Sequence, residues 1–286
     1  MKRLIRGLLL LISFFSVIGL IYYLQIRFFS PGTLSKQPNI RYTNTPTVFI
    51  HGYEGSSFSF GPLLRNLERQ NVAKRELTIV VDSAGKLQVE GKLRNTHDNP
   101  TIMVLFEKDS QSEITQSKWI DRVMRYLEKQ GVHSVNLVAH SMGGVSLLRY
   151  LLEYANPQTE PVVEKVVTIA APFNDLEIAE DTEDVFAYEL TQNGPSGYTP
   201  IYQYFDRSMN RLPQKLRVLN VAGDLKDGSE SDGSVSVHSA FSLRYLLEKH
   251  TKSYQEYLVT GKSGGHSVIT RSLSFQKRLI QFLWQK

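Results

Sequence analysis

The residue best placed to do chemistry is Ser141, in the stretch A-H-S-M-G-G that begins at Ala139. An apolar run over 135–138 is typical of a buried strand, and leucines recurring over 147–152 are typical of a helix. A strand that turns sharply into a helix at a serine holds the hydroxyl above the sheet edge and leaves the Met142 N–H free to stabilise an oxyanion. The pattern indicates a nucleophile elbow, G-x-S-x-G, with alanine replacing the first glycine. An ordinary strand-to-helix turn is the alternative.

A second oxyanion donor is expected from the loop H-G-Y-E-G at residues 51–55, which follows a short apolar strand over 47–50. Glycine in such a loop lets the backbone approach a substrate carbonyl. We assign the donor to the backbone N–H of Tyr53. The alternative is a glycine-rich turn held by a hydrogen-bonded His51.

A serine hydroxyl needs a base to take its proton, and the base needs an acid to fix its tautomer. Chains with this elbow place the residues in the order Ser, then Asp or Glu, then His. Three histidines follow an acidic loop beyond Ser141, namely His238, His250 and His266. His266 is the predicted base because it follows the last expected strand in the glycine-rich loop G-G-H-S. A surface loop histidine is the alternative.

The acid is expected in the loop over 223–235, which reads G-D-L-K-D-G-S-E-S-D-G-S-V. We favour Asp232, which heads D-G-S-V and leads into an expected helix at Ser239. Asp224 comes directly off the preceding strand and remains a candidate, with Asp227 behind it. A solvated turn or a calcium site is the alternative reading of this loop, but its acids do not match the spacing of EF-hand ligands, so we predict no metal.

The expected elements alternate between strands and helices, which indicates an α/β fold with a mainly parallel sheet flanked by helices. The turn D-S-A-G at 82–85 joins two strands without a helix and therefore predicts an antiparallel hairpin added to that sheet. Beyond the strand at 47–50 and the elbow, strands are expected at 76–82, 86–93, 101–107, 165–170, 217–221 and 254–260, and helices at 58–70, 117–130, 239–249 and the end of the chain.

Periodicity fades over 174–213, which is acidic early and then rich in Tyr, Phe, Gly and Pro. A segment inserted after a strand lies over the catalytic edge in this architecture, so we interpret it as a cap insertion. Its aromatic residues would then line the substrate site. The alternative is a solvated connection with one short helix, in which the same aromatics, Tyr198, Tyr202, Tyr204 and Phe205, form a small satellite core.

The first thirty residues differ from the rest of the chain. Residues 7–26 form a run of twenty without a charge, preceded by Lys2, Arg3 and Arg6. At ~1.5 Å per residue this run reaches ~30 Å, the thickness of the hydrocarbon core of a bilayer. The preceding basic residues favour a cytoplasmic N-terminus. We therefore expect an N-terminal membrane anchor over 1–30, a tether over 31–45, and an extracellular catalytic domain over 46–286. A cleaved signal peptide and a secreted protein are the alternative.

Composition excludes several classes of function. Four of the 33 basic residues fall in residues 1–30, which leaves 29 basic against 28 acidic residues in the remainder. No basic patch with interleaved aromatics indicates nucleic-acid binding. The chain has no cysteine, so it forms no disulfide and carries no lipid-modified cysteine anchor. We expect no metal or organic cofactor, and the sequence leaves the oligomeric state open.

Taken in order, the H-G loop after a strand, A-H-S-M-G-G, S-D-G-x-V and G-G-H-S make residues 45–286 resemble the α/β-hydrolase fold. More closely, the chain resembles the membrane-anchored cell-surface α/β hydrolases of Gram-positive bacteria. The D-G-x-V pattern at Asp232 is similar to that of lipases and esterases. The resemblance implies hydrolysis of small-molecule or lipid carboxylic esters through an acyl-serine, with Ser141, His266 and Asp232 as triad.

Two other functions remain open on the same residues. The acyl group could pass to an alcohol or amine of the cell envelope, which would make the protein an acyltransferase. The chain could also be a binding protein on a hydrolase fold whose site is inactive, since fold alone does not determine function.

Overall fold

The computed structural model describes residues 36–107, 112–175, 188–213 and 215–286. The chain divides into two units, Met1–Lys36 and Gln37–Lys286, and the described residues fall almost entirely in the second. The expected membrane span over 7–26 lies outside the described residues. Within the described ranges, no helix combines the length and the hydropathy that a membrane crossing requires.

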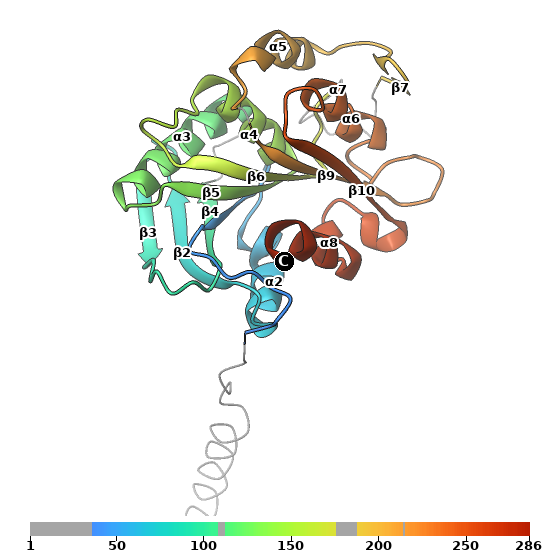
Figure 1. Cartoon of the computed structure of the whole chain (residues 1–286). Helices are drawn as coiled ribbons and strands as arrows, with labels where there is room; N and C mark the ends of the chain where they lie inside the picture. Colours follow the sequence, from blue (N-terminus) through green and yellow to red (C-terminus); the bar gives the residue numbers. More distant parts are fainter. Residues whose placement is uncertain (1–35, 108–111, 176–187, 214) are drawn as a thin grey trace, which may run out of the picture. The chain divides into compact units, whose positions relative to one another are not determined.

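A single eight-stranded sheet organises the domain, in the order β10-β9-β6-β5-β1-β4-β2-β3 (Figure 1). Its strands are β1 (Thr47–Ile50), β2 (Lys74–Val81), β3 (Leu87–Gly91), β4 (Pro100–Phe106), β5 (Ser134–His140), β6 (Val162–Ile169), β9 (Arg217–Asp224) and β10 (Ser253–Thr260). All neighbouring pairs are parallel except β2 and β3. The mainly parallel sheet and the antiparallel hairpin predicted from the sequence are therefore confirmed.

Helices cover both faces of this sheet, and each layer has its own apolar core (Figure 1). One face packs against α2 (Ser57–Arg69) and α8 (Leu273–Trp284). The other packs against α3 (Glu113–Lys129), α4 (Met142–Glu153), α5 (Pro200–Ser208) and α7 (Leu243–Leu247), while α6 (Val237–Phe241) packs on β9. Strands buried on both faces explain the near-continuous apolar runs in the sequence.

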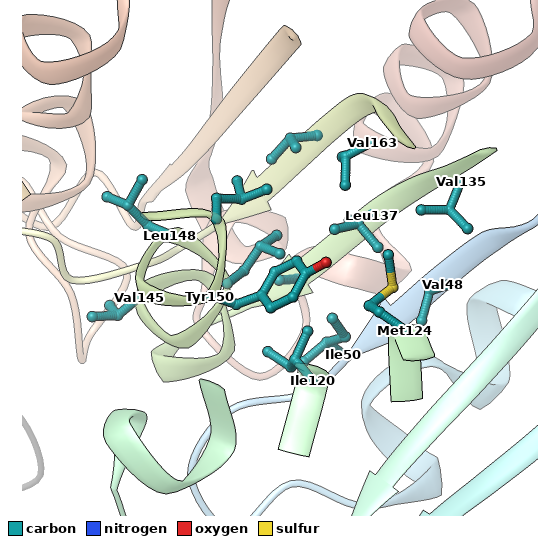
Figure 2. Close-up of a cluster of buried hydrophobic side chains, with 14 of the residues drawn as sticks. Val48, Ile50, Ile120, Met124, Val135, Leu137, Val145, Leu148, Tyr150 and Val163 are labelled. Carbon is teal, nitrogen blue, oxygen red and sulfur yellow. The ribbon is translucent and has the colours of Figure 1, made fainter. Parts of the chain in front are cut away.

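Helix α4, which follows Ser141, is anchored by the larger of these cores. Ten of its twelve residues are buried, and its Tyr150 points among side chains from the sheet and from α3 (Figure 2). The Tyr150 hydroxyl donates a 2.7 Å hydrogen bond to the Glu160 carboxylate, just before β6. Arg125 of α3 lies 3.1 Å from the other oxygen of that carboxylate. These contacts fix the end of α4 that lies away from Ser141.

Some boundaries differ from those expected. Helix α3 begins four residues early, because Ser112 caps it by accepting a hydrogen bond from the Ile114 N–H. The helix expected over 239–249 is divided into α6 and α7 at Ser242, whose hydroxyl donates to the Ser239 carbonyl. Hydrogen bonds of this kind, from a side chain to a nearby backbone group, compete with the hydrogen bonds of a regular helix. The spacing of apolar residues in the sequence does not show where they form.

The described part of the expected cap insertion, 188–213, contains a small hairpin of β7 (Leu190–Thr191) and β8 (Gly194–Pro195), then α5 and a short 3-10 helix, η1 (Met209–Arg211). Tyr202 and Phe205 are fully buried in the core beside α4, with Tyr204 packed against it, whereas Tyr198 is exposed. The aromatic side chains of α5 therefore belong to the core, as in the alternative interpretation, and do not line a substrate site. Residues 176–187 of this insertion lie outside the described residues.

Residues 37–45, which we expected to belong to a tether, pack against the domain instead. Ile40 is 2% exposed and pairs with Gln285, and the Arg41 N–H donates to the Trp284 carbonyl. Thr43 is held by hydrogen bonds with Asn99. A composition rich in polar residues predicted a linker here, but one buried isoleucine and a backbone bridge are enough to dock it.

The buried Glu160 makes stability depend on pH. Burial raises the pKa of Glu160 to about 7, above its ordinary value of 4.5. The folded state therefore holds this proton more tightly than the unfolded state, and the resulting stabilisation is lost as pH rises through about 7. We expect the melting temperature of the wild type, relative to that of Glu160→Gln, to fall between pH 5 and pH 8 in calorimetric scans. A constant difference over this range would contradict the assignment.

Candidate active site

Ser141 joins β5 directly to α4 in a backbone conformation rarely adopted by residues other than glycine, with φ 58° and ψ −139°. Two glycines make room for this turn. A Cβ atom on Gly52 would lie 2.8 Å from the Ser141 Cβ, and one on Gly143 would lie 2.6 Å from the His51 carbonyl oxygen. Ala139 is fully buried within β5, so its methyl group is accommodated there. The sharp strand-to-helix turn expected at Ser141 is present.

His266 and Asp232 come from two different loops and meet beside Ser141. The Ser141 Oγ lies 3.0 Å from His266 Nε2, and His266 Nδ1 lies 2.8 Å from Asp232 Oδ2. The Asp232 side chain is fully buried, and its Oδ2 accepts a hydrogen bond from the imidazole Nδ1–H. With Nδ1 protonated, Nε2 is left as an acceptor for the serine hydroxyl. A donor–acceptor chain of this kind can activate a serine for acyl transfer.

The Asp232 carboxylate is held by its own loop. Its Oδ1 accepts hydrogen bonds from the backbone N–H groups of Ser234 and Val235, at 2.9 Å and 2.7 Å. The Asp232 carbonyl accepts a further bond from the His266 N–H at 2.9 Å. The D-G-S-V turn therefore orients the carboxylate and also ties it to the loop that carries the imidazole.

The rival acids and the rival base His238 contact other groups. Asp224 accepts hydrogen bonds from the ammonium and the backbone N–H of Lys226, each at 2.8 Å, and these contacts lower its pKa. Asp227 accepts from Ser229. His238 lies 3.6 Å from Glu230. Among the described residues, no group of three or more acidic or histidine side chains is arranged to hold a metal ion.

The expected oxyanion donors also meet at this edge. A Cβ atom on Gly52 would lie 2.9 Å from the Met142 nitrogen, so the loop at 51–55 lies against the N-terminus of α4. The N–H groups of Met142 and Tyr53 donate to no acceptor within the described residues, which leaves both available to a substrate. His51 supports the loop: its Nδ1–H donates to the Gly52 carbonyl, and its Nε2 accepts from the Phe106 N–H. Burial lowers its pKa and keeps it neutral.

His140 is a site residue that the sequence reasoning did not single out. Its Nε2–H donates to the His266 carbonyl at 3.0 Å, and the two rings lie 4.7 Å apart. Burial, with a further contribution from His266, lowers the pKa of His140 to about 3, so it stays neutral. It braces the loop that carries His266. The available signal was its place as the last strand residue before Ser141.

Apolar side chains surround this edge of the sheet. Seven large hydrophobic side chains are exposed among the described residues. Tyr53 and Phe58 come shortly after the carboxyl end of β1 and Val268 shortly after that of β10, at the edge where Ser141 lies. The exposed Tyr198 lies next to Thr199, whose backbone N–H donates to the Asn174 side chain just beyond β6. Apolar surface around a polar site is suited to substrates with hydrocarbon groups.

Known proteins share this arrangement of elements. A protein of Listeria innocua has a structure that is 29% identical in sequence, covers 84% of this chain and 93% of its own, and superposes with a TM-score of 0.74. A cell surface hydrolase of Lactobacillus plantarum is 21% identical over 84% of this chain and 89% of its own, with a TM-score of 0.64, and supports the fold alone. Both structures come from Gram-positive bacteria and share the fold of this chain.

A curated relative adds a different activity. The 1-acylglycerol-3-phosphate O-acyltransferase ICT1 of Saccharomyces cerevisiae is 25% identical over 262 residues, which is 83% of this chain but 60% of the yeast protein. The chain thus spans less than two thirds of that relative.

Residues 35–286 match a family described as alpha/beta hydrolase of unknown function (DUF915). The order of the strands and the sharp turn at Ser141 agree with this match. The chain belongs to this family of α/β hydrolases.

Proposed function

We propose that the protein is a serine hydrolase that cleaves carboxylic esters through an acyl-serine intermediate. The observation that carries the proposal is the continuous hydrogen-bonded chain from Ser141 through His266 to Asp232. A serine, an imidazole and a buried carboxylate in this order recur on unrelated folds for the same chemistry. The family match and the esterase-like fold support a hydrolase.

Each residue has a defined role in the proposed reaction. The Ser141 oxygen attacks the ester carbonyl carbon while His266 Nε2 takes the hydroxyl proton, and Asp232 stabilises the resulting imidazolium. The carbonyl oxygen becomes an oxyanion that accepts hydrogen bonds from the Met142 and Tyr53 N–H groups. Collapse of this intermediate expels the alcohol, which receives the proton from His266. Water then attacks the acyl-serine, again with His266 as base, and the released carboxylic acid leaves Ser141 free.

The substrate is proposed to be a small-molecule or lipid ester with an apolar acyl group. The exposed side chains of Tyr53, Phe58 and Val268 lie on the loops and helix next to the nucleophile and would contact hydrocarbon on either side of the carbonyl. Burial of such a chain contributes binding free energy at ~25 cal/mol per Å² of apolar surface removed from water.

The protein's location is proposed from its sequence. The uncharged run over 7–26, with Lys2, Arg3 and Arg6 before it, favours a single membrane span with the hydrolase domain outside the cytoplasm. This placement suits a hydrolase of lipids or cell-envelope esters.

Acyl transfer is the second candidate, and the similarity to the yeast acyltransferase specifically favours it. The first half of the reaction is the same. In the second half an alcohol, instead of water, attacks the acyl-serine, His266 takes its proton, and an ester is released.

Replacing the nucleophile should abolish turnover. We expect Ser141→Ala to reduce kcat for short p-nitrophenyl esters on the order of 10⁴-fold to 10⁶-fold and to prevent labelling by a fluorophosphonate. Ser83→Ala, at an exposed serine in the turn between β2 and β3, is the matched control and should retain both. Wild-type protein that neither hydrolyses esters nor takes the label would indicate an inactive site and remove the proposal.

Two aspartates in one loop allow a matched test of the acid. Asp232→Asn should lower kcat about 10⁴-fold, because an amide at this position can leave His266 in the wrong tautomer. Asp224→Asn removes a carboxylate paired with Lys226 and should change kcat by less than about threefold. Circular dichroism of both variants checks that they fold. A large loss of activity in Asp224→Asn alone would assign the acid to Asp224.

Product analysis separates hydrolysis from transfer. With a p-nitrophenyl ester and a glycerol-based alcohol at about 1% of the molarity of water, we expect the free carboxylic acid to be the main product, since water is then in large excess. Mass spectrometry quantifies both products. A new ester as the dominant product at this ratio would establish acyl transfer as the activity.

A further inference from the structure

A second hollow in the domain lies at the edge of the sheet opposite to Ser141. It has a volume of about 420 Å³ and is lined by residues at the amino ends of β5, β6 and β9, by residues 41–45 and by the end of α8. Because β5 is seven residues long and a strand rises ~3.3 Å per residue, the two edges are ~20 Å apart. The hollow is therefore separate from the candidate active site.

Its lining is strongly basic. Five cationic side chains and a single carboxylate, that of Glu164, border the cavity. We call this the basic pocket, and its cations are Arg41, Lys165, Lys215, Arg217 and Lys252. None of the five forms a salt bridge with a carboxylate among the described residues. Residues 31–286 carry nearly equal numbers of basic and acidic side chains, so the cluster of positive charges is confined to this pocket.

The cations come from separate parts of the chain and are brought together by the fold. Arg41 belongs to the docked segment before β1, Lys165 and Arg217 to neighbouring strands, and Lys252 to the loop before β10. Burial lowers the pKa of Lys165, and the nearby positive charges of Arg217 and Arg41 lower it further. Like charges held this close repel one another, and a bound anion would relieve that repulsion.

One of the cations is fixed in place by the backbone. The Lys165 ammonium donates hydrogen bonds to the carbonyl oxygens of Phe282 and Leu283, at the carboxyl end of α8. These oxygens carry only partial negative charge, so they position the ammonium without neutralising the pocket. The guanidinium groups of Arg41 and Arg217 keep their donors for a ligand, and guanidinium geometry matches phosphate oxygens well.

The remaining wall is apolar and includes Val162, Val163, Leu283 and Trp284. The Trp284 indole N–H is buried and has no acceptor among the described residues. The volume of the pocket lies in the range of sites for small organic molecules and exceeds what a bare phosphate ion would fill. Charge and shape together indicate a ligand with an anionic head and an organic body.

We propose that the basic pocket binds a phosphate-bearing organic anion, with Arg41 and Arg217 on the phosphate and the wall of Val163 and Trp284 against the organic part. The ligand is either a soluble phosphate ester or the headgroup of an anionic phospholipid. The second source is favoured by the position of Arg41, which follows the apolar run at 7–26 closely in the sequence. The pocket is too far from Ser141 to hold a reacting ester, so this inference stands independently of the proposed function.

Calorimetry on the full chain in a non-ionic detergent tests the proposal. One arm titrates glycerol 3-phosphate, with glycerol as the uncharged match. The other arm titrates mixed micelles containing phosphatidylglycerol, with phosphatidylcholine as the match of zero net charge. The pocket variant is Arg41→Gln with Arg217→Gln, and the control with the same change of charge is Arg65→Gln with Lys118→Gln, at two exposed cations outside the pocket.

We expect the pocket variant to weaken binding of the phosphate ligand at least tenfold, and the control variant and Ser141→Ala to bind like the wild type. Binding should also weaken as ionic strength rises. Affinity for glycerol 3-phosphate identifies a soluble ligand, whereas affinity for phosphatidylglycerol micelles alone identifies a lipid headgroup. Wild-type protein that binds neither, or binding that the pocket variant retains, would overturn the proposal. Thermal melting of each variant checks that a loss of binding does not reflect unfolding.

Discussion

The geometry of the candidate site depends on the close approach of two backbones, the loop at 51–55 and the turn at Ser141. A positive φ at a residue other than glycine costs on the order of 1–3 kcal/mol, so the surroundings must hold it in place. Gly52 and Gly143 allow the approach, and the Ser141 N–H still bonds the Ile169 carbonyl at 2.9 Å. The buried face of α4 then prevents the helix from relaxing away from the strand.

Everything else at the site is arranged around that fixed hydroxyl. Parallel strands place the loops after β1, β5, β9 and β10 at one edge, so residues more than a hundred positions apart can meet. The loop of Asp232 and the loop of His266 are joined by a backbone hydrogen bond as well as by the side chains. His140 adds a third attachment, because it donates a hydrogen bond to the His266 carbonyl from the strand that leads to Ser141.

The sequence was informative wherever a function leaves a local pattern. The small residues around Ser141, the D-G-S-V turn at Asp232 and the glycines before His266 each specify a backbone shape, so their positions could be predicted. The role of His140 could not be predicted in this way. Its position before Ser141 is visible in the sequence, but its hydrogen-bond partner is a carbonyl 126 residues away. The burial of Tyr202 could not be predicted either. Its position in the core depends on contacts with α4 and α7, and its own segment shows no clear periodicity of apolar residues. The packing of Ile40 against Gln285 depends on contacts between distant segments that no local pattern records.

That last pairing has a mechanical consequence for the domain. The Arg41 N–H donates to the Trp284 carbonyl, and the Lys286 N–H donates to the Asn39 carbonyl. These backbone hydrogen bonds join the segment before β1 to the segment at the end of α8. Neither segment can fray alone without exposing the unpaired peptide groups of its partner. A pulling force on the chain ahead of residue 37 would therefore act on α8 as well. Because α8 packs in the core on one face of the sheet, the segment could not detach without disturbing that core.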